Sequence, residues 1–123
     1  MAKMSLEKGK RGEREVAALL REHGFEARRG QQYSGGPDSP DVVHSIPNVH
    51  IEVKRCERFN LYEALDQAEA EQDFGKMPVV FHKRNNREWV VVLKAKDFLA
   101  TMEWLRTDVE RGREQLRAKG RLI

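Results

Sequence analysis

The chain has 123 residues, which is enough for one compact domain and little more. Hydrophobic residues make up 39% and charged residues 35%, a balance that excludes both a disordered polar chain and a membrane protein. Residues 1–5 carry no apolar core, so we expect no secretory signal. The single cysteine, Cys56, excludes an internal disulfide and a zinc site built from several thiolates. We expect a small cytoplasmic domain of the α/β or α+β class.

The formal net charge is +3, and it is unevenly distributed along the chain. Residues 1–14 and residues 106–123 each carry a net charge of +3, so residues 15–105 sum to −3. Basic ends around a mildly acidic body are typical of a protein whose ends contact nucleic-acid phosphates. Ordinary solubilising charge produces the same pattern, so charge alone leaves both interpretations open.

The first part of the chain predicts a helix, a short strand and a loop. Residues 8–23 have the spacing of an amphipathic helix, and Gly24 follows as its C-cap. Residues 25–29 are expected to form a short edge strand. Residues 30–40 predict a loop because they contain three glycines and two prolines.

The next segment predicts a β-hairpin, with strands over residues 41–45 and 49–54. Pairing across the turn places Asp41 opposite Lys54, and side-chain alternation places Glu52 on the same face as Lys54. Two carboxylates and a lysine therefore meet at the open end of the hairpin. Such a group can hold a divalent metal and a water molecule. The alternative is a surface hairpin with an exposed ion pair.

The remaining chain alternates helix and strand, with Asn60 as the N-cap of the next helix. The expected elements are a helix over 60–74, strands over 78–82 and 89–93, a helix over 97–106, and a basic surface helix or mobile tail over 107–123. Together they predict an α/β fold with a central mixed β-sheet flanked by helices. This domain is expected to cover residues 1–106, with residues 107–123 as an appended basic segment.

Glu13 is an unusual residue within the first predicted helix. It lies on the same helical stripe as Val16 and Leu20, which are expected to face the core, whereas Glu15 falls off that stripe. A carboxylate on a packing face is costly unless it is paired or binds a metal. The alternative is a favourable negative charge near the helix N-terminus.

An ordered set of short motifs connects these residues: Gly9-x-x-x-Glu13-Arg14-Glu15, Gly24-Phe25, Arg29, Ser34-Gly35, Pro40-Asp41 and Glu52-Val53-Lys54. The last two resemble the Pro-Asp…(Asp/Glu)-x-Lys signature of the PD-(D/E)xK nuclease superfamily. The whole set, over about residues 8–82, resembles the archaeal-type Holliday-junction resolvases. The resemblance implies a mixed sheet with helices on both sides.

The same resemblance implies a Mg²⁺-dependent DNA endonuclease that hydrolyses phosphodiester bonds in branched DNA. It implies that Glu13, Asp41 and Glu52 hold Mg²⁺, with the Val53 carbonyl as an extra ligand and Mn²⁺ as a substitute ion. Lys54 would orient the attacking water or help to deprotonate it. A homodimer is implied as well, because resolving a four-way junction needs two symmetric cuts.

Several side chains are candidates for DNA contact, and they are Arg14, Arg29, Gln32, Ser34 and Gln67. The two arginines grip phosphate in one interpretation and are merely solvated in the other. The four histidines match no standard zinc spacing, so no zinc site is expected. Two other functions stay open: a restriction-like or repair nuclease acting on other DNA structures, and a non-catalytic DNA-binding module with the same fold. The intact set of three carboxylates and a lysine disfavours the second.

Overall fold

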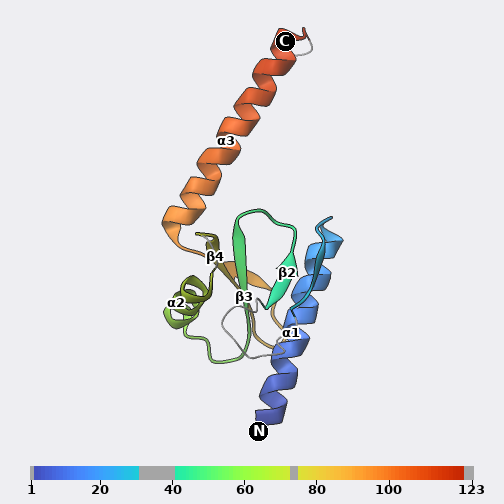
Figure 1. Cartoon of the computed structure of the whole chain (residues 1–123), viewed down its shortest axis with the longest axis vertical. Coiled ribbons are helices and arrows are strands. Elements are labelled where there is room, and N and C mark those ends of the chain that lie inside the picture. The colour runs from blue at the N-terminus through green and yellow to red at the C-terminus, as the bar shows by residue number, and fades with distance from the viewer. Residues whose placement is uncertain (1, 31–40, 73–74, 121–123) are drawn as a thin grey trace. The chain divides into compact units, whose positions relative to one another are not determined.

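The computed structural model describes residues 2–30, 41–72 and 75–120, with side chains from residue 8 onward (Figure 1). Contacts divide the chain into two units, Met1–Leu93 and Lys94–Ile123, and each unit is described by itself. The sequence instead placed a boundary after residue 106. The second unit contains a single long helix, α3 (Ala95–Ala118), which continues through that point.

The first unit has two helices and five strands in the predicted order. They are α1 (Ala2–Glu22), β1 (Ala27–Arg29), β2 (Val42–His44), β3 (Val49–Arg55), α2 (Leu61–Glu71), β4 (Met77–Lys83) and β5 (Val90–Val92). None of the helices in the described part of the chain is long and apolar enough to cross a membrane.

The predicted helix caps are confirmed. The side-chain oxygen of Asn60 accepts a hydrogen bond from the Glu63 N–H at 3.0 Å, which satisfies a backbone donor at the start of α2. Gly24 has a φ of +88°, and its N–H donates to the Arg21 carbonyl at 3.0 Å. A glycine adopts this left-handed conformation without strain, so α1 ends here.

The strands form a three-stranded mixed sheet and a separate two-stranded sheet. β3 pairs with β4 in parallel, placing Glu52 beside Val80, and β4 pairs with β5 in antiparallel orientation. β2 pairs with β1, with Val42 opposite Arg29.

The predicted hairpin between β2 and β3 is therefore wrong. The turn between these strands is tied to β4 instead, because the Met77 N–H donates to the Asn48 carbonyl at 2.9 Å. Asn48 has a φ of +64°, a conformation that redirects the chain into the parallel sheet. Alternation of side chains identified both strands, but it carries no information about which neighbour each strand pairs with.

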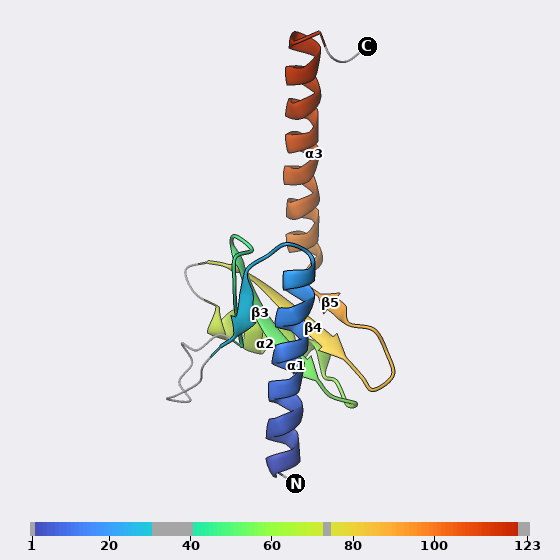
Figure 2. The ribbon, with the colours of Figure 1, turned by 90° about the vertical axis from the view of Figure 1, so that its right-hand side faces the viewer.

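The two helices of the first unit cover opposite faces of the three-stranded sheet (Figure 2). α1 packs on the face that carries Ile51 and Val53, and α2 packs on the face that carries Val80. Gly12 allows α1 to approach closely, because a Cβ at this position would lie 2.9 Å from the Cβ of Arg55. Side chains on β3 thus alternate between an α1 layer and an α2 layer.

Candidate functional site

The predicted metal-binding residues meet along one edge of β3. The Val53 N–H donates to Oδ2 of Asp41 at 2.8 Å, so Asp41 lies beside this edge. The N–H and C=O of one strand residue point to the same side, and the Val53 carbonyl therefore faces this edge too. The carboxyl groups of Asp41 and Glu52 share a hydrogen bond, and Nζ of Lys54 lies 3.4 Å from Oε1 of Glu52. The convergence expected from the hairpin is present although the hairpin is not.

Glu13 approaches the same region from α1. Its Oε2 accepts a hydrogen bond from Nε of Arg29 at 2.7 Å, and its side chain is only 13% exposed. Burial raises the pKa of Glu13 and the nearby Asp41 charge raises it further, while the hydrogen bond from Arg29 opposes both effects. Glu13 is therefore within electrostatic reach of Asp41, as its place on the helical stripe predicts.

The two central carboxyl groups also have raised pKa values. Burial is the main cause for Asp41, and the hydrogen bond from Val53 opposes it by lowering the pKa. Burial, followed by the negative charges of Asp41 and Glu71, raises the pKa of Glu52 to about 8, against a smaller opposing effect of Lys54. Like charges that are buried together disfavour ionisation, and this is the arrangement that a bound cation relieves.

Sequence reasoning missed two residues of this region, His50 and Glu71. Ligand atoms of His50, Glu52 and Glu71 all lie within 4.8 Å of one another on the α2 side of the sheet. His50 shares a strand face with Glu52, so alternation could have found it. Glu71 lies at the end of α2, and only the packing of that helix brings it here. Gln67 donates a hydrogen bond from Nε2 to Oε1 of Glu71 at 3.2 Å, so Gln67 contacts this group as well.

We call Glu13, Asp41, Glu52 and Glu71 the acidic edge cluster. Within the described residues, Oε2 of Glu52 is buried and has no hydrogen-bond partner. A buried oxygen of this kind, surrounded by further carboxylates, suits a hard divalent cation that takes oxygen ligands. The residues present therefore fit the divalent metal that the resemblance implies.

Three of the five candidates for DNA contact, Arg14, Arg29 and Gln67, fall within the described residues. Arg29 is bound to Glu13, and the positive charge of Arg14, an exposed residue, lowers the pKa of Glu13. Gln32 and Ser34 lie outside the described residues.

Glu15 has surroundings of the opposite kind, which the sequence did not predict. Its carboxylate lies 3.2 Å from Nε of Arg11, 3.4 Å from Nε of Arg55 and 3.8 Å from Nζ of Lys83. Nε1 of Trp89 donates to it at 3.2 Å. We call these five residues the Glu15 cluster, and it joins α1 to the ends of β3 and β4.

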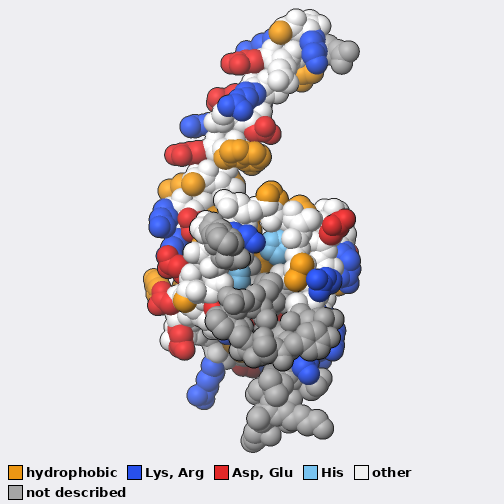
Figure 3. All heavy atoms as spheres, viewed as in Figure 1, with side chains coloured by type: hydrophobic (Ala, Val, Ile, Leu, Met, Phe, Trp, Pro, Cys, Tyr) orange, Lys and Arg blue, Asp and Glu red, His pale blue; other side chains and the backbone are white. Residues whose placement is uncertain are grey.

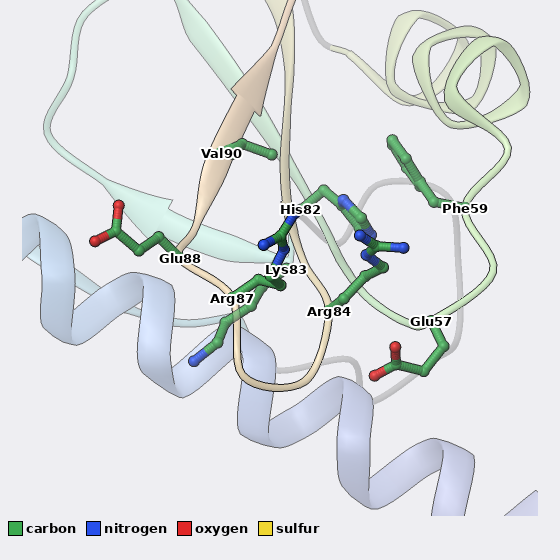
Figure 4. Close-up of a pocket in the computed structure, with 8 residues that line it drawn as sticks. All are labelled: Glu57, Phe59, His82, Lys83, Arg84, Arg87, Glu88 and Val90. Atoms are coloured by element: carbon green, nitrogen blue, oxygen red, sulfur yellow. The ribbon is translucent and has the colours of Figure 1, made fainter.

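A pocket of about 380 Å³ opens where β4 ends, and Figure 4 shows the side chains around it. It is lined by Glu57, Phe59, His82, Lys83, Arg84, Arg87, Glu88 and Val90. The rings of Phe59 and His82 stack with centroids 3.9 Å apart, and the Arg84 side chain extends toward them. Within the described part of the chain, neither Arg84 nor Arg87 forms an ion pair, although the carboxylates of Glu57 and Glu88 also line this pocket.

Comparison with known proteins gives a consistent result. The family model of archaeal Holliday junction resolvases (Hjc) matches residues 4–114. Five chains of solved structures match, among them Hjc, a Holliday junction resolvase from the archaeal hyperthermophile Archaeoglobus fulgidus. That chain is 25% identical, the match covers 68% of this chain and 73% of that chain, and the TM-score is 0.52. A search of curated proteins found no significant match.

Proposed function

The chain belongs to the archaeal Holliday junction resolvase family, and on that premise we propose that phosphodiester hydrolysis takes place at the acidic edge cluster. Membership makes the protein a structure-specific DNA endonuclease, a phosphodiester hydrolase that binds branched DNA. The observation that carries the assignment of the site is the gathering of buried carboxyl groups with raised pKa values around β3.

The resolvase family is divalent-metal dependent in general, and we propose Mg²⁺ as the ion for this chain. Glu13, Asp41, Glu52 and the Val53 carbonyl would hold it, because they offer only the oxygen ligands that Mg²⁺ prefers. A bound ion supplies positive charge for the phosphoryl oxygens and makes a water molecule more acidic. The imidazole of His50 adds a nitrogen ligand next to Glu52, which supports Mn²⁺ as a substitute.

The chain's own cations have separate tasks in this proposal. Lys54, held 3.4 Å from Glu52, orients the attacking water and offsets charge on the phosphate. Arg29 neutralises Glu13 in the free protein and is placed to meet a DNA phosphate beside it.

The pocket beside β4 provides a second group of DNA contacts. His82 on β4 lies opposite Lys54 on β3 in the parallel pair, so the pocket begins on the strand next to the one that carries Lys54. Arg84 and Arg87 would bind phosphates that flank the one being cleaved.

A homodimer completes the proposal. Resolving a four-way junction needs two symmetric cuts, and the described structure offers one acidic edge cluster per chain. Two copies related by a two-fold axis would present two equivalent sites to the two strands.

The test is a cleavage assay with Mg²⁺ on four-way junction, flap, single-stranded and duplex DNA of matched sequence. The expected result is paired, symmetric cuts in the junction. Glu52→Gln, purified in the same way, is the inactive control. Equal cutting of duplex DNA would make the protein a general nuclease. No cleavage with Mg²⁺ or Mn²⁺ would leave a DNA-binding module without catalysis.

A further inference from the structure

The second unit carries an apolar surface that the nuclease chemistry does not use. α3 is 24 residues long, and none of its residues is buried. Its large apolar side chains are between 39% and 68% exposed, and five of them, the apolar seam, are Phe98, Met102, Leu105, Val109 and Leu116. Hydrophobic side chains recur along this helix between charged ones (Figure 3).

The spacing of the apolar seam is that of a coiled coil. Its members follow each other at intervals of four, three, four and seven residues, and Gly112 occupies the position that divides the last interval. In heptad terms Met102, Val109 and Leu116 take position a, whereas Phe98 and Leu105 take position d. A repeat of 3.5 residues keeps such a seam facing one partner helix along its whole length.

The charges beside the seam favour a second, parallel copy of the same helix. Asp108 takes position g, and the two e positions in the polar part of α3 are Arg106 and Arg113. In a parallel dimer, position g faces position e of the next heptad on the partner, which places Asp108 opposite Arg113 of the other copy. An antiparallel pair would set arginine against arginine along the same flank.

We propose that α3 forms a parallel two-stranded coiled coil with α3 of a second copy of this chain. Val109 at position a next to Leu105 at position d is a combination that favours two strands over three or four. This interface would be the contact between the two copies of the proposed homodimer. It rests on the proposed function only for the homodimer itself. Because the first unit precedes α3 in the chain, the two nuclease units would then connect to the same, N-terminal, end of the coiled coil.

The first experiment measures the dimer dissociation constant of the full chain by sedimentation equilibrium. Leu105→Lys on the seam is compared with Trp104→Lys, which places the same charge on the adjacent residue outside the seam. We expect Leu105→Lys to weaken dimerisation at least about 100-fold, because the dimer would bury two unpaired ammonium groups. We expect Trp104→Lys to leave the dissociation constant unchanged. Equal effects of the two variants would remove the seam from the interface.

The second experiment keeps the apolar seam intact, so it does not depend on how the lysine variants fold. Asp108→Arg and Arg113→Asp should each weaken dimerisation about 3- to 10-fold, and the double variant should restore it. Mixing the two single variants should produce heterodimers in preference to homodimers. In an antiparallel pair, Arg113→Asp alone would instead relieve the repulsion from Arg106 of the other copy and strengthen dimerisation. Additive weakening in the double variant would contradict this pairing.

The two proposals fail in different ways. If Leu105→Lys stays dimeric and still makes paired cuts, the homodimer stands and the α3 interface is wrong. If the unmodified chain is monomeric at every concentration and still cuts junctions, both the homodimer and the α3 interface are wrong, while the assignment of the active site remains.

Discussion

Glu13 and Glu15 lie two residues apart on α1, yet they enter surroundings of opposite charge. Glu13 belongs to the acidic edge cluster, where burial and then the negative charge of Asp41 raise its pKa, and Arg29 is its one hydrogen-bonded cation among the described residues. Glu15 meets three cations and an indole N–H. Paired charges such as those around Glu15 hold elements together. Unbalanced like charges such as those around Glu13 lower the stability of the fold.

The comparison separates a site for chemistry from a structural contact. The acidic edge cluster keeps carboxylates buried at a cost that only a bound cation recovers. The Glu15 cluster is balanced within the protein itself, because Arg55, which is 8% exposed, and Lys83 fix the ends of β3 and β4 to α1. Three sets of measurements test this distinction, and a fourth tests the pocket beside β4.

The largest effect is expected from neutralising the centre of the acidic edge cluster. Asp41→Asn and Glu52→Gln should each lower the cleavage rate about 100- to 1,000-fold, because charge stabilisation of the transition state is lost. DNA binding should persist or tighten, since a negative charge near the phosphate disappears. Single-turnover cleavage and fluorescence anisotropy with the same junction measure the two quantities. A variant that cuts at the unmodified rate would place catalysis elsewhere.

The matched pair on α1 should respond in opposite ways. Glu13→Gln should slow cleavage about 100-fold and leave the free energy of unfolding unchanged or higher. Glu15→Gln should retain cleavage and lower the free energy of unfolding by roughly 1–3 kcal/mol, as hydrogen bonds to charged groups are weakened. Urea unfolding and a Mg²⁺ titration of the cleavage rate are run on both. Indistinguishable behaviour of the two variants would erase the contrast between the clusters.

Stability without metal should depend on pH through Glu52. Its pKa is raised to about 8 in the folded chain from an ordinary 4.5, so between these values the folded state binds a proton that the unfolded state lacks. The contribution of Glu52 to the free energy of unfolding is therefore fully present below pH 4.5, and it is lost as the pH rises through about 8. Thermal melts should show the unmodified chain losing stability relative to Glu52→Gln across this range. Added Mg²⁺ should reduce the loss, and a constant difference between the two proteins would contradict the raised pKa.

A smaller effect is expected at the pocket beside β4. Arg84→Ala and Arg87→Ala should each reduce the slope of log affinity against log salt by about 0.9, the value for one phosphate contact. The cleavage rate at saturating protein should stay the same, because neither arginine lies in the acidic edge cluster. Lys96→Ala on α3 serves as the control for loss of one surface cation. An unchanged slope in both variants would remove this pocket from the DNA path.

Local signals in the sequence predicted much of this structure. Asn60 and Gly24 cap their helices as expected, since a cap depends on one side chain and the adjacent backbone. The helical stripe placed Glu13 correctly, because helical periodicity fixes a direction within one element. The same reasoning treated Glu15 as unattached, since its partners Arg55 and Lys83 come from other strands.

Signals that depend on the arrangement of elements were missed. The pairing of β2 with β1 and the hydrogen bond from Met77 to the Asn48 carbonyl each join different segments of the chain, and no local pattern records either contact. Glu71 joins the site only because α2 packs across the sheet. The helix expected over residues 97–106 and the surface helix that was one of two alternatives over residues 107–123 form a single helix, α3, because the charged continuation contains many good helix formers.

The close contact between Gly12 and β3 also determines where α1 can be engineered. Replacing a helical glycine with alanine commonly stabilises a protein by about 0.5–1 kcal/mol, and α1 contains two such positions. A Cβ at Gly9 would have no neighbour within 4 Å, so Gly9→Ala should bring this gain in thermal melts. At Gly12 the added methyl group would meet Arg55 and Val53, displacing Glu13 and Glu15 together from their partners. A programme of thermostabilisation can therefore use the first glycine and must leave the second unchanged.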